Sequence, residues 1–494
     1  MLREGASAFP RYYDVMRTPP SRRTLPALLW IGIVLVLVAV VSALPYARRH
    51  VYNPSSLSGF AAFSCAGQVL RQGADPYRAE PLRSCEQALP SYRYDAAGAV
   101  EPAPFPPVVL LAFAPLSLLP FGAAFALYAA LALAAIGVAT WALVRLSGLP
   151  VAFVAASLAV SALYQNLKFG EIPPLVIGIL CGAALLLERR RYGWAVAVAA
   201  LALIEPHVAA PVLVALLIAS KPARLPIVIA GAVLAGLSLV LVPPATTLEY
   251  FLGVLPAHAA SEVGASDQYS LTWIAHQLGA PDVVALRLGT VAYVVAATLG
   301  IILAMRLAAR FGRPAFLVLV PAAFAMIGGA FIHDIQLPIA LPAALLLLAV
   351  AEGRARIAAL AAVMALAVSW FDDSGALLGI AALAVLVWTS PLAPDAPLRR
   401  VAVAIAVCAG FALVIAAFHR LPGGLAVALP AHPDVGGPPG ELASEVWGRY
   451  VRATAYGYSS LRTVAEKLPL FGALLLLAYA TFATAGRAVQ RDQG

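Results

Sequence analysis

Three short groups of polar residues interrupt long apolar stretches of this chain. One is Glu205, Pro206 and His207, in the middle of AVAVAALALIEPHVAAPVLVALLIAS (residues 195–220). The others are YQNLKFGE (residues 164–171) and FIHDIQLP (residues 331–338). A charge at bilayer depth costs at least about 2.5–3.5 kcal/mol, so it seldom persists there without a partner or a function. Carboxylate and imidazole groups can take a proton from a hydroxyl, and a cation can hold an anionic substrate, so these groups are candidates for catalysis.

The candidate residues come from several parts of the chain. For catalysis we single out Glu205, His207, His333 and Asp334. For substrate binding we single out Gln165, Asn166, Lys168 and Glu171, together with Asp75 and Tyr77 of the first loop and Gln268 and Tyr269 of residues 243–282. The same loop also carries His258, Asp267 and His276.

Several of these residues have a structural alternative. Asp75-Pro76 is also a common turn sequence. Lys168 can act as an interfacial anchor that extends to the lipid headgroups. Glu205 and His207 can form a pair that holds the tip of a helical hairpin, and His333-Asp334 can be a short hydrated turn. These alternatives stay open at the level of the sequence.

The composition defines the class of protein that must position these groups. Hydrophobic residues make up 62% of the chain and charged residues 12%, whereas a soluble domain is nearer half apolar and a quarter charged. The chain is therefore predicted to be an integral membrane protein. Its net charge of +9 does not indicate a nucleic-acid partner, because the basic residues occur in short clusters between apolar runs. No P-loop, dinucleotide-binding glycine motif or zinc-ligand spacing is present, so we predict no cofactor and no metal ion.

The apolar runs predict an all-α polytopic fold of about 12–14 transmembrane or re-entrant helices, since a span needs roughly 20 apolar residues. Residues 1–24 are expected to form a cytoplasmic tail and residues 25–46 a first, uncleaved span, before a large external loop at residues 47–105. PPVVLLAFAPLSLLP (residues 106–120) is too short to span and is expected at the outer interface. Further spans are predicted near residues 121–145, 149–163, 172–188, 224–242, 283–305, 315–332, 336–351, 355–371, 375–391, 398–418 and 468–486.

Basic clusters indicate the orientation, because cytoplasmic loops carry an excess of Lys and Arg. One topology puts every short basic loop on the side of the N-terminus: Arg189–Arg191, Lys221/Arg224, Arg306/Arg310/Arg313, Arg354/Arg356, Arg399/Arg400 and Arg487/Arg491. It leaves the 243–282 and 419–467 loops outside. The prediction is a multi-pass protein of the cytoplasmic (inner) membrane with both termini in the cytoplasm.

Residues 193–220 are expected to enter the membrane and return. Arg191 and Lys221 are both predicted inside, so two half-helices must meet at Glu205-Pro206-His207. Pro206 lacks an amide proton and disfavours helix at Glu205, which fits a break there. Broken helices are tolerated in a membrane only where protein or a water-filled cavity surrounds them. The alternative is one straight span that would put Lys221 outside.

Cys65 and Cys85 both lie in the first external loop, whereas Cys181 and Cys408 sit in apolar runs. An outer compartment permits disulfides, so we predict a bridge between Cys65 and Cys85, with two unpaired thiols as the alternative. Taken together, the polar groups suit a reaction at the outer membrane surface on a lipid-linked anionic donor. Such a reaction needs a cation for the donor phosphate and a group that takes a proton from an acceptor hydroxyl.

Four blocks of the chain resemble glycosyltransferase family 87. They are AGQVLRQGADPY, PFPPVVLLAFAPLSLLPFGAAFALYAAL, LKFGEIPPLVIGILCGAALLLERRRYGWAVAVAALALIEP and HDIQLPIALPAALLLL. The resemblance covers roughly residues 50–350. It implies a GT-C-like transmembrane core over residues 25–350, with residues 351–494 as additional C-terminal helices. It also implies a mannosyltransferase that uses a polyprenyl-phosphate donor on the outer face of the membrane.

The chain departs from the family pattern at three positions. Members of the family place an aspartate, the expected base, where this chain has Gly59. The "GQ" of the middle block is Gly170-Glu171 here, and the usual "KP" is Glu205-Pro206. Either the base has moved, with Glu205 or Asp334 in the role, or the chain acts on another substrate or on none.

Two hypotheses about function follow. In the first, an inverting glycosyltransferase moves a mannose-like sugar from a polyprenyl-phosphate donor to a lipid or glycan acceptor. His207 and His333 would then orient or stabilise the reacting groups, and Lys168 would bind the donor phosphate. The second is a non-enzymatic transporter or flippase for a lipid-linked sugar, or a structural partner. Common transporters show an internal repeat in their hydropathy, and the two halves of this chain do not echo each other, which favours the enzyme.

Overall fold

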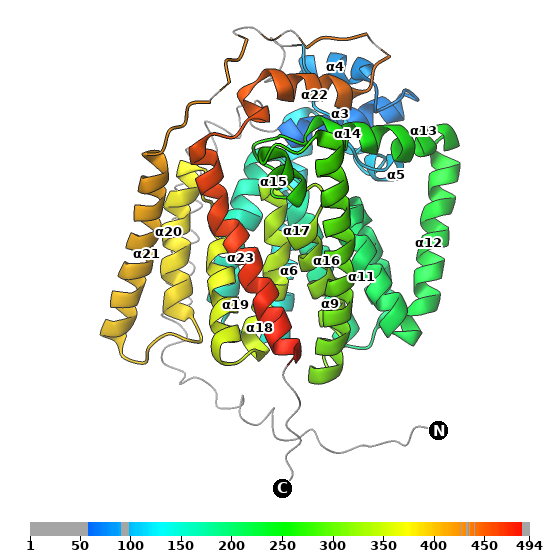
Figure 1. The fold of residues 1–494 in the computed structure, drawn as a ribbon. Coiled ribbons are helices and arrows are strands. Elements are labelled where there is room, and N and C mark those ends of the chain that lie inside the picture. Colours follow the sequence, from blue (N-terminus) through cyan, green and yellow to red (C-terminus); the bar gives the residue numbers. More distant parts are fainter. Residues whose placement is uncertain are drawn as a thin grey trace. The chain divides into compact units, whose positions relative to one another are not determined.

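The computed structural model describes residues 58–89, 98–425, 427–430, 433, 435–438 and 440–486, all within one compact unit. The predicted tail (residues 1–24), the predicted first span (residues 25–46), and Arg487 and Arg491 lie outside the described residues. The described part is helical (Figure 1), and its only β-pairings are two isolated bridges, Arg78 with Leu442 and Gln268 with His333. The prediction of an all-α polytopic membrane protein is therefore confirmed.

Proline begins many of the helices, because its fixed φ suits the first turn and its missing amide proton needs no partner there. The α-helices are α3 (Ser58–Arg71), α4 (Ala79–Gln87), α5 (Pro107–Leu110), α6 (Phe121–Ser147), α7 (Val151–Leu158), α8 (Asn166–Phe169), α9 (Pro173–Glu188), α10 (Tyr192–Leu201), α11 (Pro206–Ala219), α12 (Lys221–Leu241), α13 (Pro244–Glu249), α14 (Leu255–Ser261), α15 (Leu271–Gln277), α16 (Asp282–Phe311), α17 (Phe316–Gly328), α18 (Leu341–Val350), α19 (Gly353–Leu366), α20 (Asp373–Thr389), α21 (Pro397–His419), α22 (Ala443–Ala453) and α23 (Leu461–Gly486). Short 3₁₀ or π-helical segments adjoin them at η3 (Leu116–Leu118), η4 (Ala159–Gln165), η5 (Ala202–Ile204), η6 (Tyr250–Val254), η7 (Asp334–Ala340) and η8 (Ala455–Gly457).

Six helices of the described chain are long and apolar enough to cross a membrane: Phe121–Ser147, Val151–Phe169, Lys221–Leu241, Asp282–Phe311, Pro397–His419 and Leu461–Gly486. Shorter apolar helices lie at Pro173–Glu188, Tyr192–Ile204, Pro206–Ala219, Phe316–Gly328, Asp334–Val350 and Ser374–Thr389. Each predicted span beyond residue 120 overlaps one of these helices except the span at residues 355–371, which overlaps the shorter α19. The stretch 106–120 forms only α5 and η3, as its length and prolines predict.

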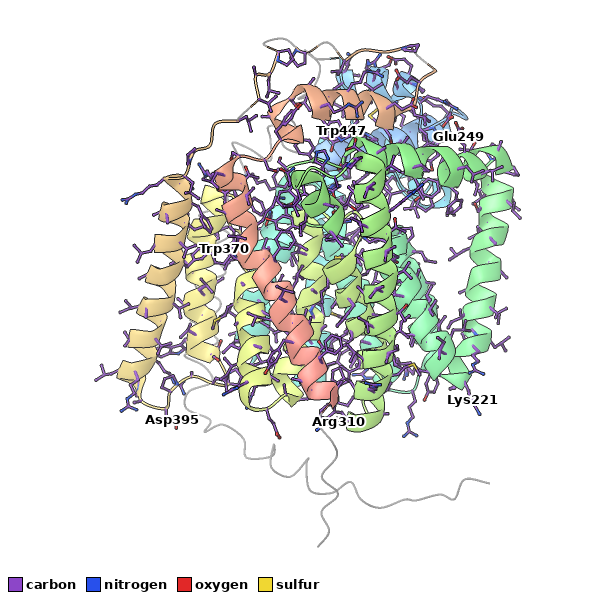
Figure 2. The ribbon with its side chains drawn as sticks, viewed as in Figure 1. Lys221, Glu249, Arg310, Trp370, Asp395 and Trp447 are labelled. Atoms are coloured by element: carbon purple, nitrogen blue, oxygen red, sulfur yellow. A yellow bond between two sulfur atoms is a disulfide. The ribbon has the colours of Figure 1, made fainter. Side chains whose placement is uncertain are left out.

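The bundle has two chemically different ends. Figure 2 shows Lys221, Arg310 and Asp395 at one end, which we call the basic end, and Glu249 and Trp447 at the other, the cavity end. Arg313, which follows α16, lies 3.5 Å from Glu188 of α9, so Arg189–Arg191 also belong to the basic end. The predicted basic clusters around residues 189, 221 and 310 therefore share one end of the molecule.

The segment between Arg191 and Lys221 is a broken hairpin. α10 and η5 run away from the basic end, and α11 returns to it. Glu205, between them, has φ −117° and ψ 83°, which is not helical, because the ring of Pro206 restricts the preceding residue. The Glu205 carbonyl accepts hydrogen bonds from the amides of Val208 and Ala209, both at 3.0 Å, and so begins α11. The break lies where the sequence predicts it.

The core of the bundle is α17, which packs against α9, α11 and α16. Nearly every residue of α17 is buried. By contrast, α12 buries only Ala223 and α21 only Phe411, and most Leu, Val and Ile side chains of both helices are exposed. An apolar surface of this extent is stable in lipid rather than in water. The exposed faces of α12 and α21 therefore fit a membrane-embedded bundle.

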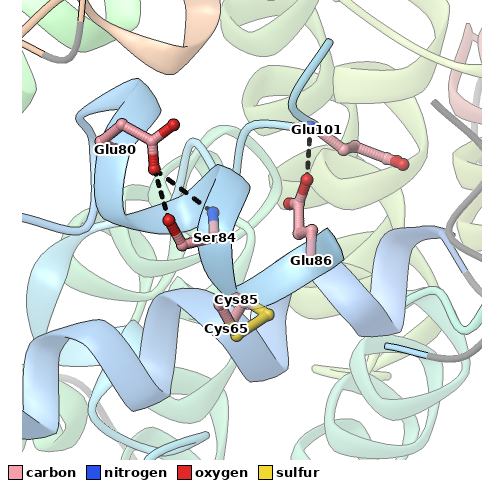
Figure 3. The surroundings of a disulfide bond; sticks show 6 residues. All are labelled: Cys65, Glu80, Ser84, Cys85, Glu86 and Glu101. Carbon is pink, nitrogen blue, oxygen red and sulfur yellow. Dashed lines mark hydrogen bonds between the residues drawn. A yellow bond between two sulfur atoms is a disulfide. The ribbon is translucent and has the colours of Figure 1, made fainter. Parts of the chain in front are cut away.

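The first loop is cross-linked. Cys65 of α3 and Cys85 of α4 form a disulfide, with their Cα atoms 5.7 Å apart (Figure 3). Beside it, the buried Glu86 accepts a hydrogen bond at 3.2 Å from the backbone amide of Glu101. The disulfide-linked helices are thereby joined to the stretch that leads into α5.

A C-terminal segment packs on this first loop. The amide of Ala79 donates to the Glu441 carbonyl and the amide of Ala443 to the Tyr77 carbonyl, both at 2.8 Å. Arg78 links three segments, because it binds Asp75, Glu249 and the Gly440 carbonyl. Since α22 follows directly, residues far beyond the first loop are held at the cavity end. Residues on both sides of position 350 belong to the one compact unit, and the division at residue 350 stays a proposal.

Candidate active site

A cavity of about 580 Å³ lies at the cavity end of the bundle, within the size range of small-molecule sites. It is lined by residues of the first loop, the hairpin break, the 250–267 segment, the stretch before α18, and α22 with its successor. Its charged and polar lining residues are Glu101, Glu171, Glu205, Glu262, Asp267, Asp334, His207, His258, His333, Gln336, Tyr250, Tyr293, Trp447 and Tyr456. The cavity therefore collects carboxylates and imidazoles from segments spread along the chain.

The hairpin break brings Glu205 and His207 to this cavity. Glu205 is 4% exposed, and its Oε2 accepts a hydrogen bond from Gln336 Nε2 at 3.2 Å. His207 Nδ1 lies 3.4 Å from the same oxygen, and its Nε2 has no hydrogen-bond partner among the described residues. Tyr293 of α16 donates to the His207 carbonyl at 2.7 Å. The broken helix is thus held by its neighbours, while one ring nitrogen of His207 is left unpaired.

His333 is held as a cation beside Glu262. Its Nε2 lies 2.8 Å from Glu262 Oε2, and the indole of Trp447 donates to Glu262 Oε1 at 2.5 Å. Burial alone would lower the pKa of His333, but the carboxylates of Asp267 and Glu262 and the hydrogen bond to Glu262 raise it to about 10. His333 is therefore protonated at neutral pH. It supplies a fixed positive charge to the cavity wall.

Asp334 and Asp267 are tied to the surrounding chain. Asp334 Oδ1 accepts from the Ile335 amide at 2.7 Å, and its Oδ2 lies 3.5 Å from Gln165 Nε2. The Asp334 amide donates to the Asp267 carbonyl at 3.1 Å, and Tyr456 donates to Asp267 Oδ2 at 2.6 Å. Both carboxylates line the cavity, and each accepts a hydrogen bond from a protein group.

Glu171 lies against Gly59 of α3. A Cβ built on Gly59 would stand 2.3 Å from Glu171 Oε1, so the carboxylate occupies the space beside the glycine. The preceding Gly170 has φ +77°, a left-handed conformation that glycine adopts readily. Burial, and then the charge of Glu101, raise the pKa of Glu171 well above its ordinary value. Gly59 and Glu171, which are far apart in sequence, thus share one wall of the cavity.

The structure brings together five of the candidate residues, since Glu171, Glu205, His207, His333 and Asp334 all line the cavity. Two more lie directly behind it. Gln165 reaches Asp334, and the buried Asn166 donates from Nδ2 to the Ser161 carbonyl at 2.9 Å and the Ile335 carbonyl at 3.1 Å. Their contacts hold the wall in place.

The other predicted binding residues are not among those that line the cavity. Lys168 forms an ion pair with Asp372 at 2.8 Å. Asp75 lies in a turn, where it accepts from the Tyr77 amide at 2.9 Å, and the Tyr77 hydroxyl donates to the Phe105 carbonyl at 2.6 Å. Gln268 and Tyr269 are buried beneath Lys467, whose Nζ donates to the Gln268 carbonyl at 2.5 Å and lies 4.2 Å from the Tyr269 ring.

Several residues at the cavity escaped the sequence reasoning, namely Glu101, Glu262, Tyr250, Trp447 and Tyr456. Trp447 carried a usable signal, because ASEVWGRYVRA places apolar residues on one face of a short helix inside a polar loop. Glu262 and Tyr456 had no comparable local pattern. In the part of the chain that the structure describes, no group of three or more His, Cys, Asp or Glu side chains is arranged to hold a metal ion.

The fold and the cavity define a polytopic α-helical membrane protein with a polar site at one end of its bundle. The family model of glycosyltransferase family 87 matches residues 104–332. Over that segment the chain is similar to this family; the segment contains Glu171, Glu205 and Glu262 and ends just before His333. A comparison with curated proteins found no match. This similarity suggests a membrane glycosyltransferase.

Proposed function

We propose that the protein transfers a mannose-like sugar from a polyprenyl-phosphate donor to a lipid or glycan acceptor, and that the cavity is its active site. The observation that carries this proposal is the set of groups facing one cavity: several carboxylates and a protonated histidine. Sugar transfer from a phosphate needs both kinds of group, a proton acceptor for the hydroxyl and a positive charge for the leaving phosphate.

The proposed reaction is a single displacement with inversion. The acceptor hydroxyl loses its proton to a carboxylate of the cavity, and the oxygen lone pair forms a bond to the anomeric carbon. The bond between that carbon and the phosphate oxygen breaks, and its electron pair leaves on the polyprenyl phosphate. The products are the glycosylated acceptor, the lipid phosphate and a protonated carboxyl group.

We propose that His333 binds the donor phosphate. The sequence pointed to Lys168 for this role, but Lys168 is paired with Asp372 and is not among the lining residues. His333 lines the cavity and carries a positive charge that Glu262 stabilises at 2.8 Å. His207, with its unpaired Nε2, is placed to donate to or accept from a sugar hydroxyl.

Glu205 and Asp334 remain proposed members of the site. Each can take the proton of the acceptor, and each also binds a protein group, Gln336 in one case and the Ile335 amide in the other. A general base must reach the proton that it removes. The choice among the carboxylates therefore depends on which one is open to the substrate.

The proposal includes an orientation of the protein in the membrane. We place the protein in the cytoplasmic membrane with the basic end and both termini inside, because Lys and Arg accumulate in cytoplasmic loops. The cavity end then faces outward, where a polyprenyl-phosphate sugar is presented after its translocation. The exposed apolar faces of α12 and α16 support entry of a lipid tail from the bilayer.

The test is direct. Purified protein in nanodiscs is incubated with a panel of radiolabelled polyprenyl-phosphate sugars and membrane lipid extract, and products are separated by chromatography. We expect transfer from at least one donor, and His333→Gln should lose it while His276→Gln, a change outside the cavity, should not. Movement of labelled donor across the membrane of sealed proteoliposomes, with no transfer product in either preparation, would favour the transporter hypothesis instead.

A further inference from the structure

The space beside Gly59 is filled by a carboxylate from another element. A Cβ on residue 59 would lie 2.3 Å from Glu171 Oε1, 2.7 Å from its Cδ and 3.1 Å from its Oε2. The backbone of α3 does not require glycine at residue 59, because this residue is part of a regular helix without a left-handed φ. Glycine is a poorer helix former than alanine. The glycine is therefore explained by the room that it leaves for Glu171.

The main chain at Glu171 is tightly fixed. Its amide donates to the Asn166 carbonyl at 2.9 Å, and Tyr128 donates a hydrogen bond to its carbonyl. Gly170 packs so closely on α3 that a Cβ there would lie 2.5 Å from Phe60 Cβ. These contacts hold the backbone from three sides, so the position from which the carboxylate enters the cavity is well defined.

The carboxylate itself binds no protein group in the described residues. Glu205 and Asp334 each accept a hydrogen bond from the protein, whereas the hydrogen bonds of Glu171 all belong to its main chain. A carboxylate held for structural reasons is expected to have its oxygens satisfied, because an unpaired buried acceptor is costly. Glu171 instead lines the cavity with its carboxylate beside Gly59, which also lines it, so a substrate hydroxyl can donate to it there.

We propose that Glu171 is the catalytic base of the glycosyl transfer and that Gly59 is a glycine in order to admit it. This proposal rests on the proposed function. The acceptor hydroxyl transfers its proton to the Glu171 carboxylate while its oxygen bonds to the anomeric carbon and the donor phosphate leaves with the electrons of the broken bond. Glu205 and Asp334 act as positioning residues that orient Gln336 and the chain around His333.

The environment of Glu171 suits a base. Burial raises the pKa of its carboxyl group well above the ordinary value, with Glu101, Glu205 and Asp334 acting in the same direction and His333 against them. A carboxylate of raised pKa binds a proton more strongly than an exposed glutamate does. Catalysis by a general base is most efficient when this pKa approaches the working pH.

The proposal is tested by removing the carboxylate and then restoring it from the other side of the contact. Glu171→Gln keeps the shape and loses the proton acceptor, so transfer should fall about 10²-fold or more with donor binding and melting temperature unchanged. Glu352→Gln, an exposed carboxylate away from the cavity, serves as the matched control. A folded Glu171→Gln protein that keeps most of its activity, or one that no longer binds the donor, would overturn the role as base.

Restoration uses the geometry of the pair. Because a Cβ on residue 59 points at the Glu171 carboxylate, an aspartate there places its own carboxylate in nearly the same volume once the glutamate is shortened. Gly59→Asp combined with Glu171→Ala should therefore regain at least about tenfold over Glu171→Ala alone, whereas Gly59→Asp alone should be impaired by the clash. A double variant that melts like the wild type but is no more active than Glu171→Ala would contradict the proposal.

These outcomes distinguish a failure of the proposed function from a failure of the role proposed for Glu171. A wild-type protein that transfers no sugar from any donor overturns the proposed function and the role of Glu171 with it. An active wild type with an active Glu171→Gln variant overturns only the assignment of the base. Loss in Glu171→Gln with recovery in the double variant supports both, since a purely structural carboxylate would not be replaced from residue 59.

Discussion

The indole nitrogen of Trp447 donates a hydrogen bond to Glu262 Oε1 at 2.5 Å, across 185 residues of sequence. The other oxygen of Glu262 lies 2.8 Å from His333 Nε2. One carboxylate thus connects α22 to the charged histidine of the cavity. The C-terminal segment forms part of the cavity wall, because Trp447 and Tyr456 line the cavity, although the family model ends at residue 332.

Trp447→Phe removes this hydrogen bond and keeps most of the ring. Because Glu262 is buried, the lost partner should cost about 1–3 kcal/mol of stability, and transfer should fall because His333 is less firmly held. Thermal unfolding and the transfer assay measure the two effects. Trp194→Phe, at a tryptophan that is 69% exposed, is the matched control and should change neither. Unaltered stability and activity in Trp447→Phe would remove α22 from the proposed site.

Glu205→Gln tests the carboxylate of the hairpin break. A glutamine there keeps an oxygen that can accept from Gln336, so we expect a stable protein whose transfer rate falls less than about tenfold. A fall of 10²-fold, the usual scale for a lost general base, would move the base from Glu171 to Glu205. Asp334→Asn is compared in parallel, because it tests the third carboxylate in the same way.

The disulfide should stabilise the first loop. It closes a loop with a sequence separation of 20 residues, for which the chain-entropy account gives about 3 kcal/mol. Cys65→Ser/Cys85→Ser should therefore melt at a lower temperature than the wild type, and reductant should lower the melting temperature of the wild type alone. Mass spectrometry of an alkylated, non-reduced digest checks the pairing; recovery of alkylated Cys65 and alkylated Cys85 would refute it, whereas Cys181 and Cys408 are free in either case.

The stability of the protein should depend on pH through His333. Its pKa is raised from 6.5 to about 10 in the folded state, so the folded protein binds this proton more tightly than the unfolded chain does. The stabilisation is complete below pH 6.5 and is lost as the pH rises through about 10. Thermal unfolding between pH 6 and 10 should show this decline. His333→Gln should flatten it, and an equally steep decline in that variant would assign the effect to another group.

The orientation in the membrane can be tested with reporters. Lys221 and Asp395 lie at the end of the bundle opposite Trp447 (Figure 2), so reporters after Lys221 and Asp395 should report the same compartment. A reporter in the 419–467 loop should report the other one. We expect the first pair to be cytoplasmic because basic residues surround it. A signal from outside at Lys221 alone would contradict the hairpin at residues 193–220.

Local patterns in the sequence determined most of the architecture. Apolar runs located the helices, because a lipid-embedded helix must be apolar over its length. Pro206 located the break at Glu205, because its ring excludes helical geometry at the preceding residue. The basic clusters around residues 189, 221 and 310 predicted a hairpin that returns to one end of the bundle, and in the structure these clusters share that end. Each of these inferences depends on residues that are neighbours in the chain.

The composition of the site depended on contacts between distant residues. Nothing near Gly59 in the sequence shows that Glu171 fills the space beside it, and nothing near Glu262 shows that Trp447 is its partner. The sequence predicted Lys168 as a ligand of the donor phosphate or as an interfacial anchor, and only the structure shows its ion pair with Asp372. Such pairings follow from how helices pack and from which side chain fills a given volume. Only the tertiary structure decides them, because the energy of a polar group in a membrane depends on the partner it meets.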